Sequence, residues 1–188
     1  MKELKPAILM CLLFTVLCGG LYPAVVTGIA QAVFPHQANG SLITDVNGQA
    51  VGSELIGQPF TESHYFWPRP SATAEFAYNP MASGGSNNGP SNPAFLATVA
   101  ERVEALRVTG VTGPIPADLV LASASGLDPH ISLEAARLQI PRIAKMRNLS
   151  EDAVAGLVDI HTEGRQMGLL GEPRVNVLLL NRALDSQS

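Results

Sequence analysis

Three residue types that can carry out hydrolysis occur within five positions of this 188-residue sequence: Asp128, His130 and Ser132. A serine hydroxyl, a histidine base and an orienting carboxylate form a nucleophilic triad when the fold brings them into hydrogen-bonding contact. The spacing also has a structural interpretation, which we favour. Asp128 and Pro129 form a turn, and Ser132 caps the helix that follows. Catalysis by a hydrolase remains the alternative.

The sequence lacks the other common patterns for catalysis or cofactor binding. The glycine-rich stretch GGSNNGP, residues 84–90, contains no lysine, and none occurs between Lys5 and Lys145, so a phosphate-binding P-loop is excluded. There is no GxGxxG, HExxH, paired-cysteine or TVGYG pattern. The net charge of −4 argues against nucleic-acid binding. We therefore expect no bound metal, no directly bound cofactor and no nucleic-acid partner.

A long apolar segment near the N-terminus predicts a membrane-spanning helix. No Asp, Glu, Lys or Arg occurs between Pro6 and Thr44, and residues 7–34 are almost all apolar or small. Such a helix reaches about 42 Å, which exceeds the roughly 30 Å hydrocarbon core of a bilayer. The alternative is a signal peptide cleaved near AQA, residues 30–32, which would release a soluble binding module.

We favour a retained anchor because small residues recur at every fourth position, where another helix can approach closely. These predicted packing residues are Gly20, Ala24, Gly28 and Ala32. Pro23 is expected to kink the helix. Lys2 and Lys5 precede the segment and neutral residues follow it, so the positive-inside rule places the N-terminus in the cytoplasm. We expect residues 1–6 to be cytoplasmic, residues 7–34 to cross the cell inner membrane once, and residues 35–188 to form a periplasmic domain.

Turn and cap signals predict the elements of that domain. Asn47-Gly48, within residues 41–57, is typical of a β-hairpin with a two-residue type I′ turn. Asn92 and Pro93 predict the start of a helix, and Gly110 its end.

The C-terminal part predicts two more helices and a strand. Ser132 and Ser150 are expected to cap the helices, and Pro141 is expected to break or kink the first of them. The sequence RVNVLLLN, residues 174–181, predicts a strand. Helices and strands are mixed without a βαβ repeat. We therefore expect an α+β fold: a single N-terminal transmembrane helix followed by one small mixed α+β extracytoplasmic domain.

Seven sequence blocks follow one another in an order found in one protein family. The blocks are FPHQANGSL (34–42), GSELIGQPF (52–60), YFWPRPSA (65–72), ASGGSNNGPSNP (82–93), SASGLDPHIS (123–132), QIPRIAKMR (139–147) and GEPRVNVLLLNRALD (171–185). Together they resemble the C subunit of the Kdp-type potassium-transporting P-type ATPase over nearly the whole chain. The alternative that remains is a membrane-anchored periplasmic hydrolase.

The resemblance implies a non-catalytic accessory subunit of a high-affinity potassium uptake complex. It implies partnership with a channel-like A subunit, an ATP-hydrolysing B subunit and a small F peptide, within the lipid bilayer. ATP and potassium would act at the level of the complex. The family is also described as ATP-binding, or as assisting nucleotide binding, and Gln139 and Arg142 are the residues to test for that role. The topology argues against direct contact with cytoplasmic ATP.

The same resemblance suggests that exposed loops rich in small and aromatic residues contact partner subunits, close to one another on the exported surface. The stretch ASGGSNNGPSN, residues 82–92, is expected to shape the domain rather than to bind phosphate. The predicted partner-contact residues are Tyr65, Phe66, Arg69, Ser83, Gly84, Gly85, Asn87, Asp128 and His130.

Overall fold

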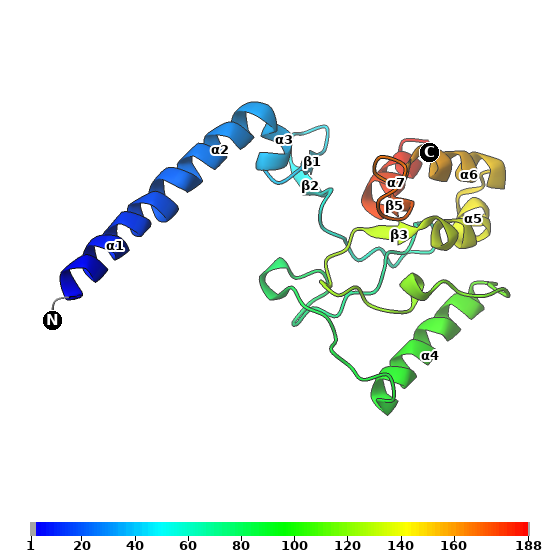
Figure 1. Cartoon of the computed structure of the whole chain (residues 1–188). Coiled ribbons are helices and arrows are strands. Elements are labelled where there is room, and N and C mark those ends of the chain that lie inside the picture. Colours follow the sequence, from blue (N-terminus) through cyan, green and yellow to red (C-terminus); the bar gives the residue numbers. More distant parts are fainter. Residues whose placement is uncertain (1–2, 188) are drawn as a thin grey trace. The chain divides into compact units, whose positions relative to one another are not determined.

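A computed structural model gives the conformation of residues 3–187 (Figure 1). The chain separates into two units, Met1–Val51 and Gly52–Ser188, and each is described by itself. The mixture of helices and short strands confirms the predicted α+β class.

The N-terminal unit begins with an uninterrupted helix that is long and apolar enough to cross a membrane. It consists of α1 (Leu4–Val16), the π-helical turn η1 (Leu17–Leu21) and α2 (Tyr22–Val33). The π turn lies just before Pro23, which has no N–H to donate to the carbonyl four residues earlier, so the regular α-helical hydrogen-bond pattern cannot continue there. Within the turn the pattern is shifted by one residue, because the Tyr22 N–H bonds to the Leu17 carbonyl, five residues back. Pro23 is thus accommodated without ending the helix.

A short helix, α3 (Pro35–Ala38), leads into the predicted hairpin of β1 (Leu42–Thr44) and β2 (Ala50–Ser53). The hairpin is confirmed, but the predicted type I′ turn is wrong, since only Gly48 of the Asn47-Gly48 pair has a positive φ, +78°. The Gly48 N–H bonds to the Asp45 carbonyl at 3.1 Å. The Asp45 carboxylate accepts from the Asn47 N–H at 2.9 Å and the Gln49 N–H at 2.8 Å. This side chain favours a type I turn closed by a left-handed glycine.

The capping predictions in the second unit are confirmed. Helix α4 (Pro93–Val108) begins where the Asn92 side chain accepts from the Ala94 N–H at 3.0 Å. Helix α5 (Leu133–Arg147) is capped by Ser132, and α6 (Glu151–Ile160) by Ser150. Two 3₁₀ turns, η2 (Pro80–Ala82) and η3 (Ala117–Leu119), lie in the connecting segments.

The sequence predicts that Pro141 breaks or kinks α5, and the structure shows no break. The helix runs continuously from Leu133 to Arg147 with Pro141 inside it. Pro141 is exposed, and so is Arg137, whose carbonyl is the one a proline at position 141 leaves without an α-helical partner. A carbonyl on the solvent side can bond to water, so the missing hydrogen bond is tolerated.

The three-stranded antiparallel sheet has the order β3-β5-β4, with β3 (His130–Ser132), β4 (Thr162–Glu163) and β5 (Arg174–Asn176). Its central pair joins Ile131 to Val175, and both side chains are buried. The predicted strand 174–181 is wrong beyond residue 176, because α7 (Val177–Asp185) begins there. The Asn176 side chain caps it by accepting from the Leu179 N–H at 3.2 Å.

The core of the second unit lies among α5, α6, α7 and the sheet (Figure 1). Helix α4 contributes Leu106, which is buried, and Val99 and Val103, which pack partly against the same cluster. The residues buried in the cluster are Phe66, Leu106, Leu119, Val120, Ile131, Ala135, Ala136, Ile140, Ile143, Ala144, Val154, Leu157, Val158, Val175, Val177, Leu180 and Leu184.

Two buried amide side chains hold the extended segment around Phe66 and Trp67 against the helices. From α7, Asn181 accepts from the Phe66 N–H at 2.8 Å and donates to the Phe66 carbonyl at 3.0 Å. From α5, Gln139 does the same for Trp67, at 2.7 and 3.1 Å. Both amides are 1% exposed. They therefore pair with the backbone of this segment as a neighbouring strand would.

We predict that Asn181→Ala and Gln139→Ala each lower the free energy of unfolding by about 1–3 kcal/mol, because the backbone groups of residue 66 stay buried, and those of residue 67 partly buried, without partners. Thermal unfolding of the full chain in detergent, followed by circular dichroism, measures the change. Gln187→Ala is the matched control, since Gln187 is an exposed amide near the C-terminus. Equal unfolding temperatures for all three variants would contradict the assignment.

Candidate functional site

The loops predicted to lie together on the surface are joined by hydrogen bonds in the structure. Ser71 Oγ donates to the Gly126 carbonyl at 2.7 Å, and the Gly84 N–H donates to the Ser125 carbonyl at 2.9 Å. Ser83 Oγ donates to the same Ser125 carbonyl at 3.1 Å. The glycine-rich stretch thus packs against the loop that precedes β3, and the predicted proximity of these blocks is confirmed.

Gly126 shows how closely these loops approach one another. Its φ is +70°, a left-handed conformation that favours glycine, and a Cβ atom there would lie 2.5 Å from Thr73 Cγ2. The buried Tyr78 phenol donates to the Arg69 carbonyl, and its N–H donates to Ser71 Oγ at 2.9 Å. Burial raises the pKa of Tyr78. These contacts hold the loops in one arrangement.

Three of the predicted residues lie together where the loops meet: Arg69 forms an ion pair with Asp128, and His130 contacts the same carboxylate. Arg69 Nη1 lies 3.2 Å from Asp128 Oδ2, and His130 Nδ1 lies 3.3 Å from Asp128 Oδ1. Burial favours a higher pKa for Asp128, but hydrogen bonds and charge from His130, together with Arg69, outweigh it and lower the pKa on balance. Asp128 therefore serves as a charged anchor that ties the 65–72 segment to the start of β3.

Ser132 does not complete a catalytic triad in this conformation. Its hydroxyl lies 3.3 Å from Asp118 Oδ1 and accepts from the Ala135 N–H at 3.0 Å. Its own N–H donates to Asp118 Oδ2 at 2.7 Å. The hydroxyl is thus engaged as a helix cap, and its hydrogen bonds are to Asp118 and Ala135 instead of His130.

A cavity of about 560 Å³, lined by both polar and apolar atoms, lies beside these residues. The titratable side chains that line it are Asp118, Asp128, His130, Glu134, Glu172 and Arg174, together with Arg69. Three of the four carboxylates have the following partners within the chain: Ser132 for Asp118, Arg69 for Asp128 and Arg165 for Glu172. Among residues 3–187, no group of three His, Cys, Asp or Glu side chains is arranged to hold a metal ion. The arrangement favours a fixed polar surface.

Gln139 and Arg142 lie one turn apart on α5, and both contact Trp67. Arg142 Nη2 donates to Gln139 Oε1 at 2.7 Å, and Nη1 donates to the Ser63 carbonyl. Its guanidinium lies 4.3 Å from the centre of the Trp67 ring, a cation–π contact. Burial lowers the pKa of Arg142 to about 10, which leaves the group charged at neutral pH. The amide and the guanidinium are thus occupied by contacts within the chain.

The sequence analysis did not identify three residues that hold this region together in the structure: Arg147, Asn181 and Asp185. Arg147 Nε donates to the His64 carbonyl at 2.8 Å, and Nη2 pairs with Asp185 at 2.6 Å. Tyr65 Oη donates to the other Asp185 oxygen at 3.0 Å. All three lie in the blocks 139–147 and 171–185 that carry the family resemblance, which was the available signal.

The other predicted site residues differ in exposure. Phe66 is fully buried, so it is a core residue and offers no surface to a partner in this conformation. Tyr65 and Arg69 are half-buried, and Asn87 is exposed with a φ of +50°. On the apolar helix, Gly20, Ala24, Gly28 and Ala32 are all exposed. Gly20 belongs to the π turn, so only the last three share the regular spacing of α2.

Comparison with known proteins agrees with the resemblance of the seven blocks. A family described as "K+-transporting ATPase, c chain" matches residues 4–186. The chain is 70% identical over 186 residues to the potassium-transporting ATPase KdpC subunit of Geobacter sulfurreducens, which covers 99% of this chain and 98% of the relative. Identity is 68% over 185 residues for the Geobacter metallireducens subunit, with 98% of each chain covered. It is 65% over 188 residues for that of Geotalea uraniireducens, with 100% of each covered. The chain therefore belongs to the family of the C subunits of potassium-transporting ATPases.

Proposed function

We propose that the chain is a non-catalytic accessory subunit of a high-affinity, ATP-driven potassium uptake complex. The observation that carries this proposal is the family match over residues 4–186. In this proposal the subunit is needed for assembly of a channel-like A subunit and an ATP-hydrolysing B subunit, together with a small F peptide. The helix Leu4–Val33 crosses the cell inner membrane once, with the N-terminus in the cytoplasm and the second unit in the periplasm.

The geometry of the loops supports a role in binding other subunits. Their backbone is fixed by Ser71, Tyr78 and Gly126 through contacts within the chain. Beside them, Trp67 and Pro68 line an apolar cavity of about 370 Å³. A surface that is already ordered loses little conformational entropy when it binds, which favours tight association.

ATP and potassium act, in this proposal, at the level of the complex. The Gln139 amide is buried and bonded to Trp67, and the Arg142 guanidinium lies over the ring of the same residue. These contacts favour a structural role for the pair over direct nucleotide binding. An effect of this subunit on nucleotide binding would then pass through its partners.

The proposal predicts that Gly28→Leu reduces the amount of A subunit that copurifies with the chain. A Cβ atom added at Gly28 would meet no atom from elsewhere in the chain within 4 Å, so a partner helix has room to approach this position closely, and a leucine would fill that room. Copurification from detergent-solubilised membranes, followed by quantitative blotting, measures the effect. Val26→Leu is the matched control, because Val26 is exposed on the same helix but away from Gly28. Normal assembly of the Gly28 variant would count against this packing face.

A second prediction separates the accessory subunit from the alternative, a membrane-anchored periplasmic hydrolase. If the chain is an accessory subunit, we expect His130→Ala, which removes a contact of Asp128 in the predicted partner-contact loops, to slow growth at low potassium, and Ser132→Gly, which alters a helix cap, to leave growth largely intact. Glycine is chosen at position 132 because it keeps most of the capping preference, at a loss of only about a few tenths of a kcal/mol. Growth rates in potassium-limited medium, in a strain that depends on this transporter, test the point. Hydrolase activity that disappears in both variants would favour the rival.

A further inference from the structure

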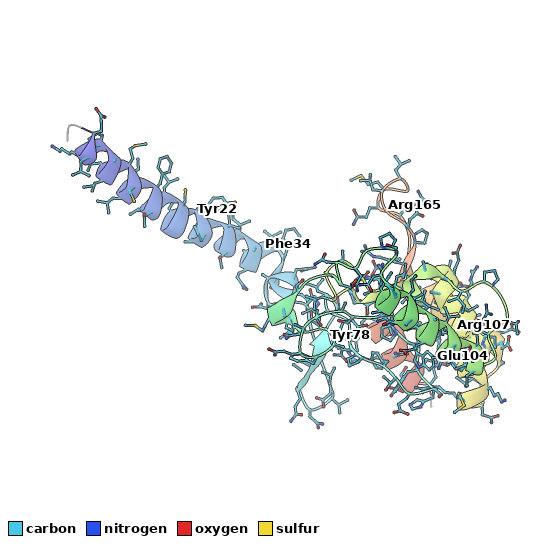
Figure 2. The ribbon with its side chains drawn as sticks, turned by 90° about the horizontal axis from the view of Figure 1, so that it is seen from below. Tyr22, Phe34, Tyr78, Glu104, Arg107 and Arg165 are labelled. Atoms are coloured by element: carbon cyan, nitrogen blue, oxygen red, sulfur yellow. The ribbon has the colours of Figure 1, made fainter. Side chains whose placement is uncertain are left out.

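A hairpin arm, residues 162–176, carries an exposed apolar tip that the function described so far does not use. The arm contains β4, β5 and the turn between them, and the tip consists of Met167, Leu169 and Leu170. These side chains are 95%, 80% and 62% exposed. Figure 2 shows the arm, with Arg165 labelled, standing away from the rest of the second unit. Large apolar side chains gathered on a projection usually mark an interaction site.

The hairpin arm is ordered by its own hydrogen bonds and ion pairs. Gln166 and Leu170 exchange two backbone hydrogen bonds of 2.9 Å each. Between them, Met167 and Gly168 have φ values of +53° and +75°, which form a tight turn. Arg165 pairs with Glu172 at 2.6 Å. The shape of the tip therefore does not depend on packing against the domain, and it is ready to insert into a partner without further ordering.

The charges of the hairpin arm argue against a lipid surface as the occupant. Its two arginines, Arg165 and Arg174, are each paired with a glutamate, Glu172 and Glu163, at 2.6 and 2.9 Å. Segments that bind anionic membrane surfaces carry an excess of basic side chains, each of which adds to the attraction. The arm offers no such excess, and its charges cancel. The tip matches a neutral, apolar recess on a protein.

The tip is too small to hold two copies of this chain together by itself. A stable interface between two proteins buries roughly 1,600 Å² in total, far more than three side chains can supply. Apolar side chains that insert into a pocket can instead act as anchors within a larger interface. Such an interface exists if the chain assembles with different subunits through several surfaces.

We propose that the hairpin arm inserts Met167 and Leu169 into a neutral, apolar recess on another subunit of the potassium-transporting ATPase, as an anchor of assembly. This inference rests on the proposed function. It adds an attachment point in the second unit that is separate in sequence from the small-residue face of α2.

The test compares copurification of the other ATPase subunits, expressed from the same operon, with three forms of the full chain. The tip variant is M167S/L169S, and the control is V108S, which places serine at a 77% exposed apolar residue at the end of α4. The tip variant is expected to recover the complex at least about tenfold less well than the unaltered chain, as loss of two buried apolar contacts implies. The control is expected to match the unaltered chain. Equal recovery with the tip variant overturns the inference.

Two further measurements make each outcome decisive. Equal unfolding temperatures for the tip variant and the unaltered chain show that a loss of assembly is not caused by a loss of folding. A lower unfolding temperature for the tip variant overturns the claim that the tip does not pack against the domain. A photocrosslinking residue at position 169, in membranes, is expected to react with another subunit. Reaction with lipid, with a second copy of the chain or with water alone overturns the proposal. If the unaltered chain itself fails to recover the complex, the proposed function falls and this inference with it.

Discussion

The second unit depends on the attachment of one irregular segment, residues 63–67, to two helices through side chains. The segment belongs to no strand, yet its backbone polar groups need partners where it is buried. Gln139 and Asn181 supply them for Trp67 and Phe66, and Arg142 and Arg147 bond to the carbonyls of Ser63 and His64. A polar group left unpaired in the core costs as much as a hydrogen bond, so these four side chains fix the path of the segment.

The fixed segment explains how the loops of the candidate site are held. Arg69 follows Trp67 by two residues, and its ion pair with Asp128 connects the segment to the strand β3. Ser71 and Tyr78 continue the connection to Gly126, so the chain between residues 66 and 84 contacts the loop before β3 at several points. Asp128 and the Ser132 hydroxyl both have hydrogen-bonding partners within this framework. The same contacts hold the loops in one arrangement.

The apolar helix follows a different physical principle. Every side chain from Leu4 to Ile29 is exposed in the isolated chain, so burial inside the protein does not explain its composition. A bilayer does, because an α-helix satisfies its own backbone and presents apolar side chains to lipid. The π turn before Pro23 keeps the helix continuous past a residue that cannot donate a hydrogen bond. Small residues let helices approach one another closely in a membrane, and a Cβ atom added at Gly28 would meet no atom from elsewhere in the chain within 4 Å.

The sequence by itself determined the features that depend on neighbouring residues. The apolar helix, the helix starts at Asn92, Ser132 and Ser150, the hairpin near Gly48 and the family all follow from local patterns or from blocks of residues. Local chemistry sufficed there, since a cap bonds to N–H groups two or three residues away.

Only the tertiary structure decided the features that depend on distant partners. The run after Arg174 predicts a strand, but a helix forms from residue 177 because Val177, Leu180 and Leu184 then reach the core on one face. Pro141 is tolerated because its turn faces solvent. The pairing of Gln139 with Trp67 and of Asn181 with Phe66 joins residues 72 and 115 positions apart. No local pattern records such pairs, because the free energy that selects them arises only when the folded chain removes these groups from water.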